Sequence, residues 1–192
     1  MSLVFRENNY NRLLQEMHST EYDIHAMIVY PQTGVLIRMY TDYISELLQD
    51  NMLTVYVSHY ETVNAVRNNF VKMRALSKDN LQEYENNGSL LIVDNVKTHF
   101  GSDFDIHLER KLLAKRAENQ RKRGAVIMAD MGWHYLEDNI EGLIESELQM
   151  PKRSKINCKT FCLYHSGDFE RLTEDQQELL RSHHMKSFEM LI

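Results

Sequence analysis

Residues 25–40, HAMIVYPQTGVLIRMY, decide the fold class of this chain. The first six residues are an apolar run that is too short for a surface helix, so we expect a buried strand. From Val35 to Leu48 apolar residues recur at helical spacing, which predicts a helix that packs against a sheet. A strand, a turn and a helix in this order are typical of α/β proteins whose turn holds the phosphates of a nucleotide.

The turn itself lacks the residues that grip phosphate. A Walker A loop needs G-x-x-x-x-G-K-[ST], in which the glycines expose backbone N–H groups and the lysine neutralises charge. Here only Gly34 is present, Val35 and Leu36 stand where Lys and Ser/Thr would be, and no glycine of the chain is followed by lysine. We therefore expect no ATP hydrolysis at this turn, and only weak anion binding by the start of the helix stays open.

The rest of the chain continues the alternation of strands and helices. Several of the strands are apolar on both faces, as in a parallel sheet that is covered on both sides. The pattern predicts an α/β fold, a three-layer sandwich with a mostly parallel sheet of about six strands. We expect the further strands at 52–60, 89–96, 125–131, 157–165 and 186–192, and helices at 8–18, 61–74, 80–88, 106–123, 132–149 and 172–184. Residues 98–105 are expected to form a polar loop in which Asp105 caps the next helix, and Thr173 is expected to cap the last one.

Bulk composition indicates one globular domain. The chain has 192 residues, 43% of them hydrophobic, and a net charge of -6, which makes nucleic acid an unfavourable partner. We find no apolar run of about 20 residues and no signal-peptide core, so we expect a cytoplasmic protein without a membrane segment. Cys158 and Cys162 lie four residues apart on one predicted strand, about 13 Å at about 3.3 Å per residue, so they cannot pair and should be semi-buried thiols.

Candidate binding residues gather at one edge of the predicted sheet. In open α/β sheets, ligands bind outside the carboxyl ends of the strands. Three histidines there, His59, His134 and His165, could converge on a metal, but we expect neither a metal nor another cofactor, and no catalytic residues. We predict a ligand-binding edge lined by Tyr30, Gln32, Thr33, His59, Glu61, Asp130, Trp133 and His134.

Several of these residues also carry a family resemblance. The first strand has the spacing H-x4-Y, His25 to Tyr30, and the fourth ends in an acid followed by Met, a small residue and Trp, at 130–133. A later helix has two glutamates, Glu145 and Glu147, and FCLYHSGDF ends in a DF-like turn. In this order the motifs resemble the MEDS domains, a sensory family of methanogens and methylotrophs that is regarded as a degenerate KaiC/RecA-like branch.

The resemblance implies a single MEDS-like domain over residues 1–192, with residues 1–22 as an N-terminal helical extension. It implies a non-catalytic sensory or regulatory domain, in signal transduction or transcriptional regulation, that binds an unknown small ligand or a protein partner. Two departures concern chemistry: Asp130 stands where the family more often has Glu, and only Glu61 matches the glutamate pair of KaiC-like ATPases. Both weaken an interpretation in which the chain activates water.

Three alternatives stay open on the sequence. The chain could be an oligomeric protein-interaction module, for instance a homo-oligomer, with a vestigial nucleotide site. It could be a nucleotide- or metal-dependent enzyme. The basic segment from Arg110 to Arg123 could contact DNA or an acidic partner, although such a run is usually a solvated helix face.

Overall fold

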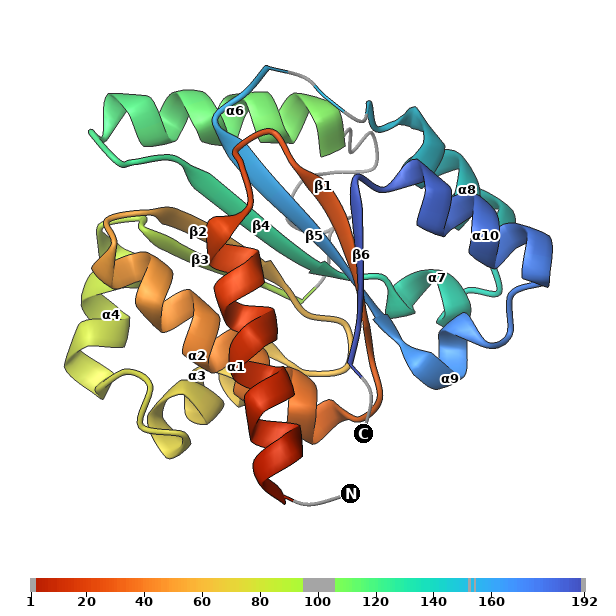
Figure 1. Cartoon of the computed structure of the whole chain (residues 1–192). Coiled ribbons are helices and arrows are strands. Elements are labelled where there is room, and N and C mark those ends of the chain that lie inside the picture. The colour runs from red at the N-terminus through yellow and green to blue at the C-terminus, as the bar shows by residue number, and fades with distance from the viewer. Residues whose placement is uncertain (1–2, 95–105, 152, 154, 191–192) are drawn as a thin grey trace.

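One parallel sheet forms the centre of the computed structural model, which describes residues 3–94, 106–151, 153 and 155–190 (Figure 1). The strands lie in the order β3-β2-β4-β5-β1-β6, and each neighbouring pair is parallel. This confirms the predicted α/β class and the six strands. The strands are β1 His25–Tyr30, β2 Leu53–Val57, β3 Leu90–Val93, β4 Ala125–Asp130, β5 Cys158–His165 and β6 Lys186–Glu189.

Helices cover both faces of the sheet and complete a three-layer sandwich (Figure 1). On one face lie α1 Leu3–Ser19, α2 Thr33–Gln49, α3 Val63–Lys72 and α4 Lys78–Asn86. On the other face lie α6 Ile106–Asn119, α7 Gly132–Leu136, α8 Ile140–Gln149, α9 Ser166–Phe169 and α10 Glu174–His183. The described helices include none that is long and apolar enough to cross a membrane.

The two faces bury their apolar side chains differently. Under α1 to α4 a single apolar cluster runs across the sheet, and it includes Ile28, Tyr56 and Phe161. Under the other helices the apolar side chains form two separate clusters, one around Tyr164 and one around Ile127. Buried polar side chains therefore have room on this second face without interrupting the larger core.

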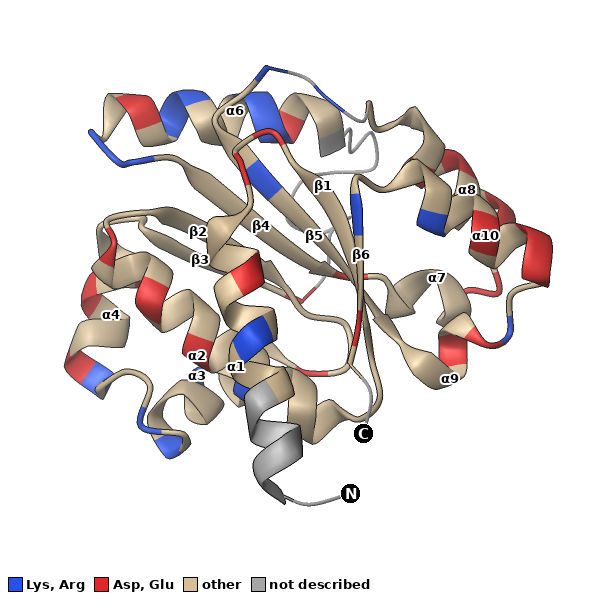
Figure 2. Cartoon of the chain, in the orientation of Figure 1, with Lys and Arg blue, Asp and Glu red and all other residues tan. Residues whose placement is uncertain are grey.

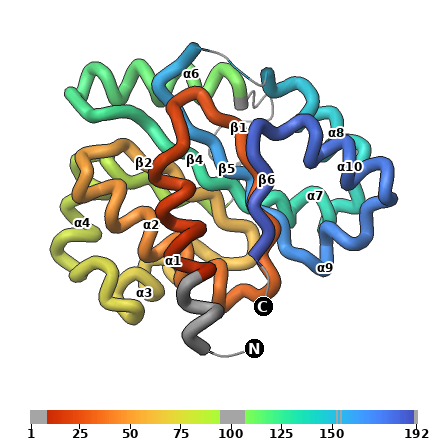
Figure 3. Tube along the Cα trace, in the orientation of Figure 1, coloured from red at the N-terminus to blue at the C-terminus, as the bar shows by residue number. Residues whose placement is uncertain are grey.

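The N-terminal helix is part of the larger core. Figure 3 shows α1 running alongside α2, and Tyr10 joins the two helices by donating a hydrogen bond of 2.7 Å to Asp42. The helix predicted at residues 8–18 begins earlier, at Leu3, because residues 3–8 contain no glycine or proline that would stop it.

Local signals placed only some of the other element ends. The strands predicted at 52–60 and 89–96 end earlier, at Val57 and Val93, and the helix predicted at 132–149 is divided into α7 and α8. Thr173 caps α10 as predicted, in a capping box with Gln176. The short helix α9 was not predicted, because four residues are too few for a periodic pattern. The predicted loop at 98–105, with Asp105, lies outside the described residues.

We predicted that the basic segment forms a solvated helix face, and this prediction is wrong for one residue. Arg110, in α6, is fully buried, and its guanidinium lies 3.8 Å from Asp23. Figure 2 shows Glu near both ends of α6, with Lys and Arg between them. The helix therefore carries charges of both signs.

Candidate functional site

Tyr30 and Asp130 meet at the carboxyl edge of the sheet. They end β1 and β4, which flank β5, and both side chains are buried. The Tyr30 hydroxyl donates a hydrogen bond of 3.1 Å to Asp130 Oδ2, and the Gly132 N–H donates one of 2.9 Å to Asp130 Oδ1. Each carboxyl oxygen therefore has a donor, and the orientation of the group is fixed.

Burial dominates the protonation of Asp130. It raises the pKa of this carboxyl to about 7, against the hydrogen bonds from Gly132 and Tyr30, which lower it. The nearby charges that contribute are the carboxylates of Asp168 and Glu61, and they raise the pKa further. Asp130 is thus a buried acid whose charged neighbours are other acids, and perturbed acids of this kind are frequent in functional sites.

Two stacked tyrosines lie next to Asp130. The rings of Tyr40 and Tyr56 stack with their centroids 4.4 Å apart. Tyr40 donates to Glu61 over 3.2 Å, and Asn69 donates to both Tyr40 and Glu61. Within the described part of the chain, the fully buried Tyr56 hydroxyl has no hydrogen-bond partner. A buried hydroxyl without a partner is costly, and a ligand or a water molecule is the usual way to satisfy it.

Tyr60 covers the turn that follows Asp130. A Cβ atom at Gly132 would lie 2.7 Å from the end of the Tyr60 side chain, so a larger residue here would require the Tyr60 ring to move. The Tyr60 hydroxyl donates a hydrogen bond to Asp168 in α9, and Tyr60 is 43% exposed. Tyr60 therefore packs on the buried acid from the solvent side.

The other predicted lining residues spread around this centre. His59 is half-buried with its ring 5.2 Å from that of Tyr60, and burial lowers its pKa. Trp133 is half-buried on α7, and its ring lies 3.6 Å from that of the buried His134. Gln32 and Thr33 are exposed where α2 begins.

The turn between β1 and α2 has an apolar interior. Leu36 is 1% exposed and belongs to the larger core. A Cβ atom added at Gly34 would meet nothing within 4 Å, so this turn does not need a glycine for close approach. The position where a phosphate-binding loop carries a polar hydroxyl residue is thus used for packing.

A second polar group lies between the sheet and helices α8 and α10. Glu147 Oε2 is 3.0 Å from His25 Nε2 and 3.2 Å from His184 Nε2, and all these side chains are buried. His25 Nε2 is also 3.3 Å from Cys162 Sγ. The other carboxyl oxygen of Glu147 accepts a hydrogen bond of 2.7 Å from Tyr164. We call His25, Glu147, Cys162 and His184 the interior cluster.

The pKa values of Glu147 and His25 in the interior cluster are both lowered, but by different causes. Burial alone would raise the pKa of Glu147, but the contacts with His184 and His25 outweigh it and hold the pKa well below its usual range. Burial lowers the pKa of His25 to about 4, against the opposing effect of Glu147. The carboxylate is therefore the stable form of Glu147.

The family model described as "MEDS: MEthanogen/methylotroph, DcmR Sensory domain" matches residues 24–184. The chain therefore belongs to the MEDS family. The match includes every predicted lining residue and the whole interior cluster, and it supports a sensory or regulatory role. No curated protein matches this chain.

The sequence predicted some, but not all, of the buried polar residues at the carboxyl edge and in the interior cluster of this MEDS domain. It placed Tyr30 and Asp130 at one edge, where they form a hydrogen bond. It singled out His25 and Glu147 only through the family resemblance, and it missed their neighbours Cys162 and His184. Among the described residues, His59, His134 and His165 do not form a group of metal-type donors, whereas the interior cluster does.

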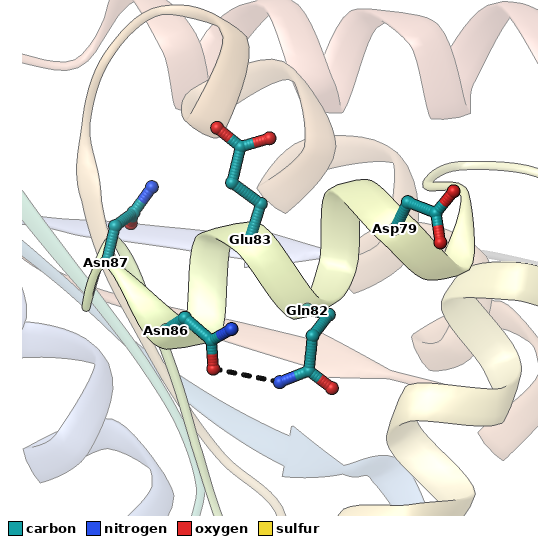
Figure 4. A pocket seen from close by; sticks show the side chains of 5 residues that line it. All are labelled: Asp79, Gln82, Glu83, Asn86 and Asn87. Carbon is teal, nitrogen blue, oxygen red and sulfur yellow. Dashed lines mark hydrogen bonds between the residues drawn. The ribbon is translucent and has the colours of Figure 1, made fainter.

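The MEDS domain also has a shallow hollow of about 550 Å³ on α4 (Figure 4). Its lining residues are polar, exposed and from one helix and its end: Asp79, Gln82, Glu83, Asn86 and Asn87. Gln82 and Asn86 already hydrogen-bond to each other over 2.9 Å. A ligand site usually converges on buried groups from several elements, so this hollow is not our candidate.

Proposed function

We propose that this MEDS domain is a non-catalytic sensor that binds a small neutral or cationic molecule at the carboxyl edge of its sheet. The observation that supports this most is the buried Asp130, whose charged neighbours are acids and whose pKa is raised to about 7. A ligand that donates a hydrogen bond or brings a positive charge would stabilise this group. The predicted lining, Tyr30, Gln32, Thr33, His59, Glu61, Asp130, Trp133 and His134, stays our proposal for the site.

The chemistry of this edge argues against a phosphate ligand. Asp130, Glu61 and Asp168 give it negative charge, and charge of the same sign repels an anion. Residues 31–37, around the turn, include no Lys or Arg, and Arg171, 3.7 Å from Asp168, offsets only part of the charge of the acids. The edge instead offers a carboxyl acceptor, the buried hydroxyl of Tyr56 and the ring of Trp133 as an apolar wall.

Signalling requires that the ligand binds two states of the domain with different affinity. Tyr60 is the element that we expect to differ, because it packs on Gly132 and is held to Asp168 by one hydrogen bond. A ligand that reaches Asp130 would displace this ring and change the surface formed by α7 and α9. A protein partner or a second copy of the chain would then bind the changed surface with a different affinity.

Thermal unfolding with a panel of small metabolites, amines and nucleotides tests the proposal. A ligand at about 100 times its Kd should stabilise the domain by about 2.7 kcal/mol. The shift should disappear in Trp133→Ala and Asp130→Asn, and it should persist in Leu136→Ala, which changes an exposed residue of the same helix. If nucleoside triphosphates stabilise the wild type and the other compounds do not, the proposed chemistry is wrong. If no compound stabilises it, a partner-binding role is the alternative, and light scattering at increasing concentration then tests for a homo-oligomer.

A further inference from the structure

We propose that the interior cluster is a zinc site, in which His25, Glu147, Cys162 and His184 hold one Zn²⁺ inside the domain. Each residue offers one donor atom, and these four atoms lie within 4.8 Å of one another. This proposal is independent of the ligand site at the carboxyl edge, and it departs from our sequence-based expectation that the chain binds no metal.

The spacing of the donor atoms suits a tetrahedral ion. With Zn–N and Zn–O bonds of about 2.0 Å and a Zn–S bond of about 2.3 Å, the donors of a tetrahedral site are about 3.3 to 3.7 Å apart. Glu147 Oε2 lies 3.0 Å from His25 Nε2 and 3.2 Å from His184 Nε2, and His25 Nε2 lies 3.3 Å from Cys162 Sγ. Small outward movements of these side chains would complete the site.

The hydrogen bond of His184 points to a missing positive charge. Its Nδ1 lies 2.7 Å from the carbonyl oxygen of Leu180, which can only accept, so Nδ1 carries a proton. In the neutral ring the other nitrogen, Nε2, is then a bare lone pair that faces Glu147 Oε2. Both atoms are buried and have no hydrogen-bond partner in the described part of the chain. Two acceptors in contact need a positive charge between them, which either a proton on Nε2 or a metal ion supplies.

The surrounding hydrogen bonds are those of a metal site. Metal-binding histidines usually donate their second N–H to a carbonyl or carboxylate, and metal-binding carboxylates are themselves hydrogen-bonded. His184 makes the first contact through Leu180, and Glu147 makes the second by accepting from Tyr164. These contacts fix the directions of two of the four donors before an ion arrives.

Charge and donor type favour zinc. Two imidazoles, one thiolate and one carboxylate are the ligand types that zinc accepts, and Mg²⁺ or Ca²⁺ would prefer oxygen alone. Zn²⁺ binding would release the Cys162 proton to solvent. The charges of the carboxylate and the thiolate would then balance the two charges of the ion. The guanidinium of Arg110 lies 3.8 Å from Asp23, and its charge also acts on His25 and Cys162.

The site would be structural rather than catalytic. Four protein donors fill a tetrahedral shell, so no position stays open for water or substrate. The donors come from β1, β5, α8 and the residue after α10, and an ion would join these elements. Because all four residues are buried, uptake requires α8 or α10 to open, and we expect slow exchange with chelators.

Metal analysis of tag-free wild-type protein tests the proposal without any variant. We expect one equivalent of zinc per chain after purification or zinc addition. X-ray absorption should then show one sulfur at about 2.3 Å and nitrogen or oxygen at about 2.0 Å. Less than about a tenth of an equivalent, or a zinc shell without sulfur, would overturn the proposal and leave a histidine–carboxylate pair.

Cobalt substitution adds a matched comparison. Co²⁺ should give the visible bands of a tetrahedral site and a thiolate charge-transfer band, which Cys162→Ser should remove. Cys158→Ser, a buried thiol on the same strand, should keep both features. Tyr164→Phe should lower zinc affinity about 10- to 100-fold, as the loss of a supporting hydrogen bond does. Equal spectra of the two cysteine variants would contradict the site.

Discussion

Asp130 and Glu147 are both buried carboxyl groups, yet their pKa values move in opposite directions. The pKa of Asp130 is raised to about 7, and that of Glu147 is held well below its usual range. Burial acts in the same direction on both groups. The difference comes from their neighbours, because Asp130 has tyrosine hydroxyls and other carboxylates around it, whereas Glu147 faces two histidines.

The comparison separates two uses of a buried acid. In the interior cluster, contacts with His184 and His25 favour the ionised form of Glu147. At the carboxyl edge, burial and the carboxylates of Asp168 and Glu61 oppose the ionisation of Asp130. Ionisation there costs stability, and a ligand that offsets this cost would bind favourably. Ligand-binding sites often contain buried ionisable groups that reduce the stability of the folded chain. This is a reason to look for the sensory function at the carboxyl edge of the sheet.

The largest effect on the free energy of unfolding should follow removal of Glu147, the ionised acid that contacts two histidines. Glu147→Ala leaves two buried histidines without their carboxylate and should destabilise the domain by about 3 to 5 kcal/mol, measured by urea unfolding in the presence of a chelator. Glu145→Ala changes an exposed acid of the same helix and should stay within about 0.5 kcal/mol. If the two variants lose similar amounts of stability, the partners of Glu147 do not contribute as proposed.

Asp130→Asn should stabilise the domain at neutral and basic pH, in contrast to Glu147→Ala. The folded chain holds the Asp130 proton more tightly than the unfolded chain, so the wild type loses stability as pH rises from 3.8 through about 7. Relative to wild type, the variant should gain about 2 to 3 kcal/mol between about pH 5 and pH 8, because each pKa unit is worth about 1.4 kcal/mol. The control Asp138→Asn, at an exposed residue with φ of 50°, should show no such gain.

Tyr30→Phe should have a smaller effect at the same edge. It removes the hydroxyl that donates to Asp130, so we expect a loss of about 1.5 kcal/mol at about pH 8. It should also raise the Asp130 pKa further, because the Tyr30 hydrogen bond lowers it. Tyr10→Phe removes a similar bond to the half-buried Asp42 and should leave the Asp130 titration unchanged. A shift of that titration in Tyr10→Phe would argue against a local cause.

The smallest effect is expected at the cap of α10. Thr173→Ala removes the oxygen that accepts from the Gln176 N–H and should cost about 1 kcal/mol. Thr173→Ser keeps a capping hydroxyl and should recover most of that loss. Because this cap is far along the chain from Asp130, a change of the Asp130 pKa in Thr173→Ala would show that the two regions are coupled.

Sequence signals predicted the strands and the carboxyl edge better than they predicted the interior cluster. Apolar runs such as HAMIVY mark buried strands, and the ends of parallel strands meet at one edge. Tyr30 and Asp130 could therefore be placed at the same edge in advance, although their hydrogen bond could not be predicted. The interior cluster combines Cys162 from the middle of a strand with His184 from the residue after a helix. No spacing rule joins such positions, because only the packing of α8 and α10 on the sheet brings them together. Arg110 was misjudged for the same reason, since periodicity in a charged helix does not show which cation is buried.

The carbon-13 NMR titration of the Asp130 carboxyl group, assigned with Asp130→Asn, tests the central claim most directly. We predict a midpoint near 7 in the ligand-free domain, because burial and neighbouring acids oppose ionisation. A midpoint near 4 would contradict the account, since Asp130 would then be an ordinary solvated carboxylate with no need of a ligand.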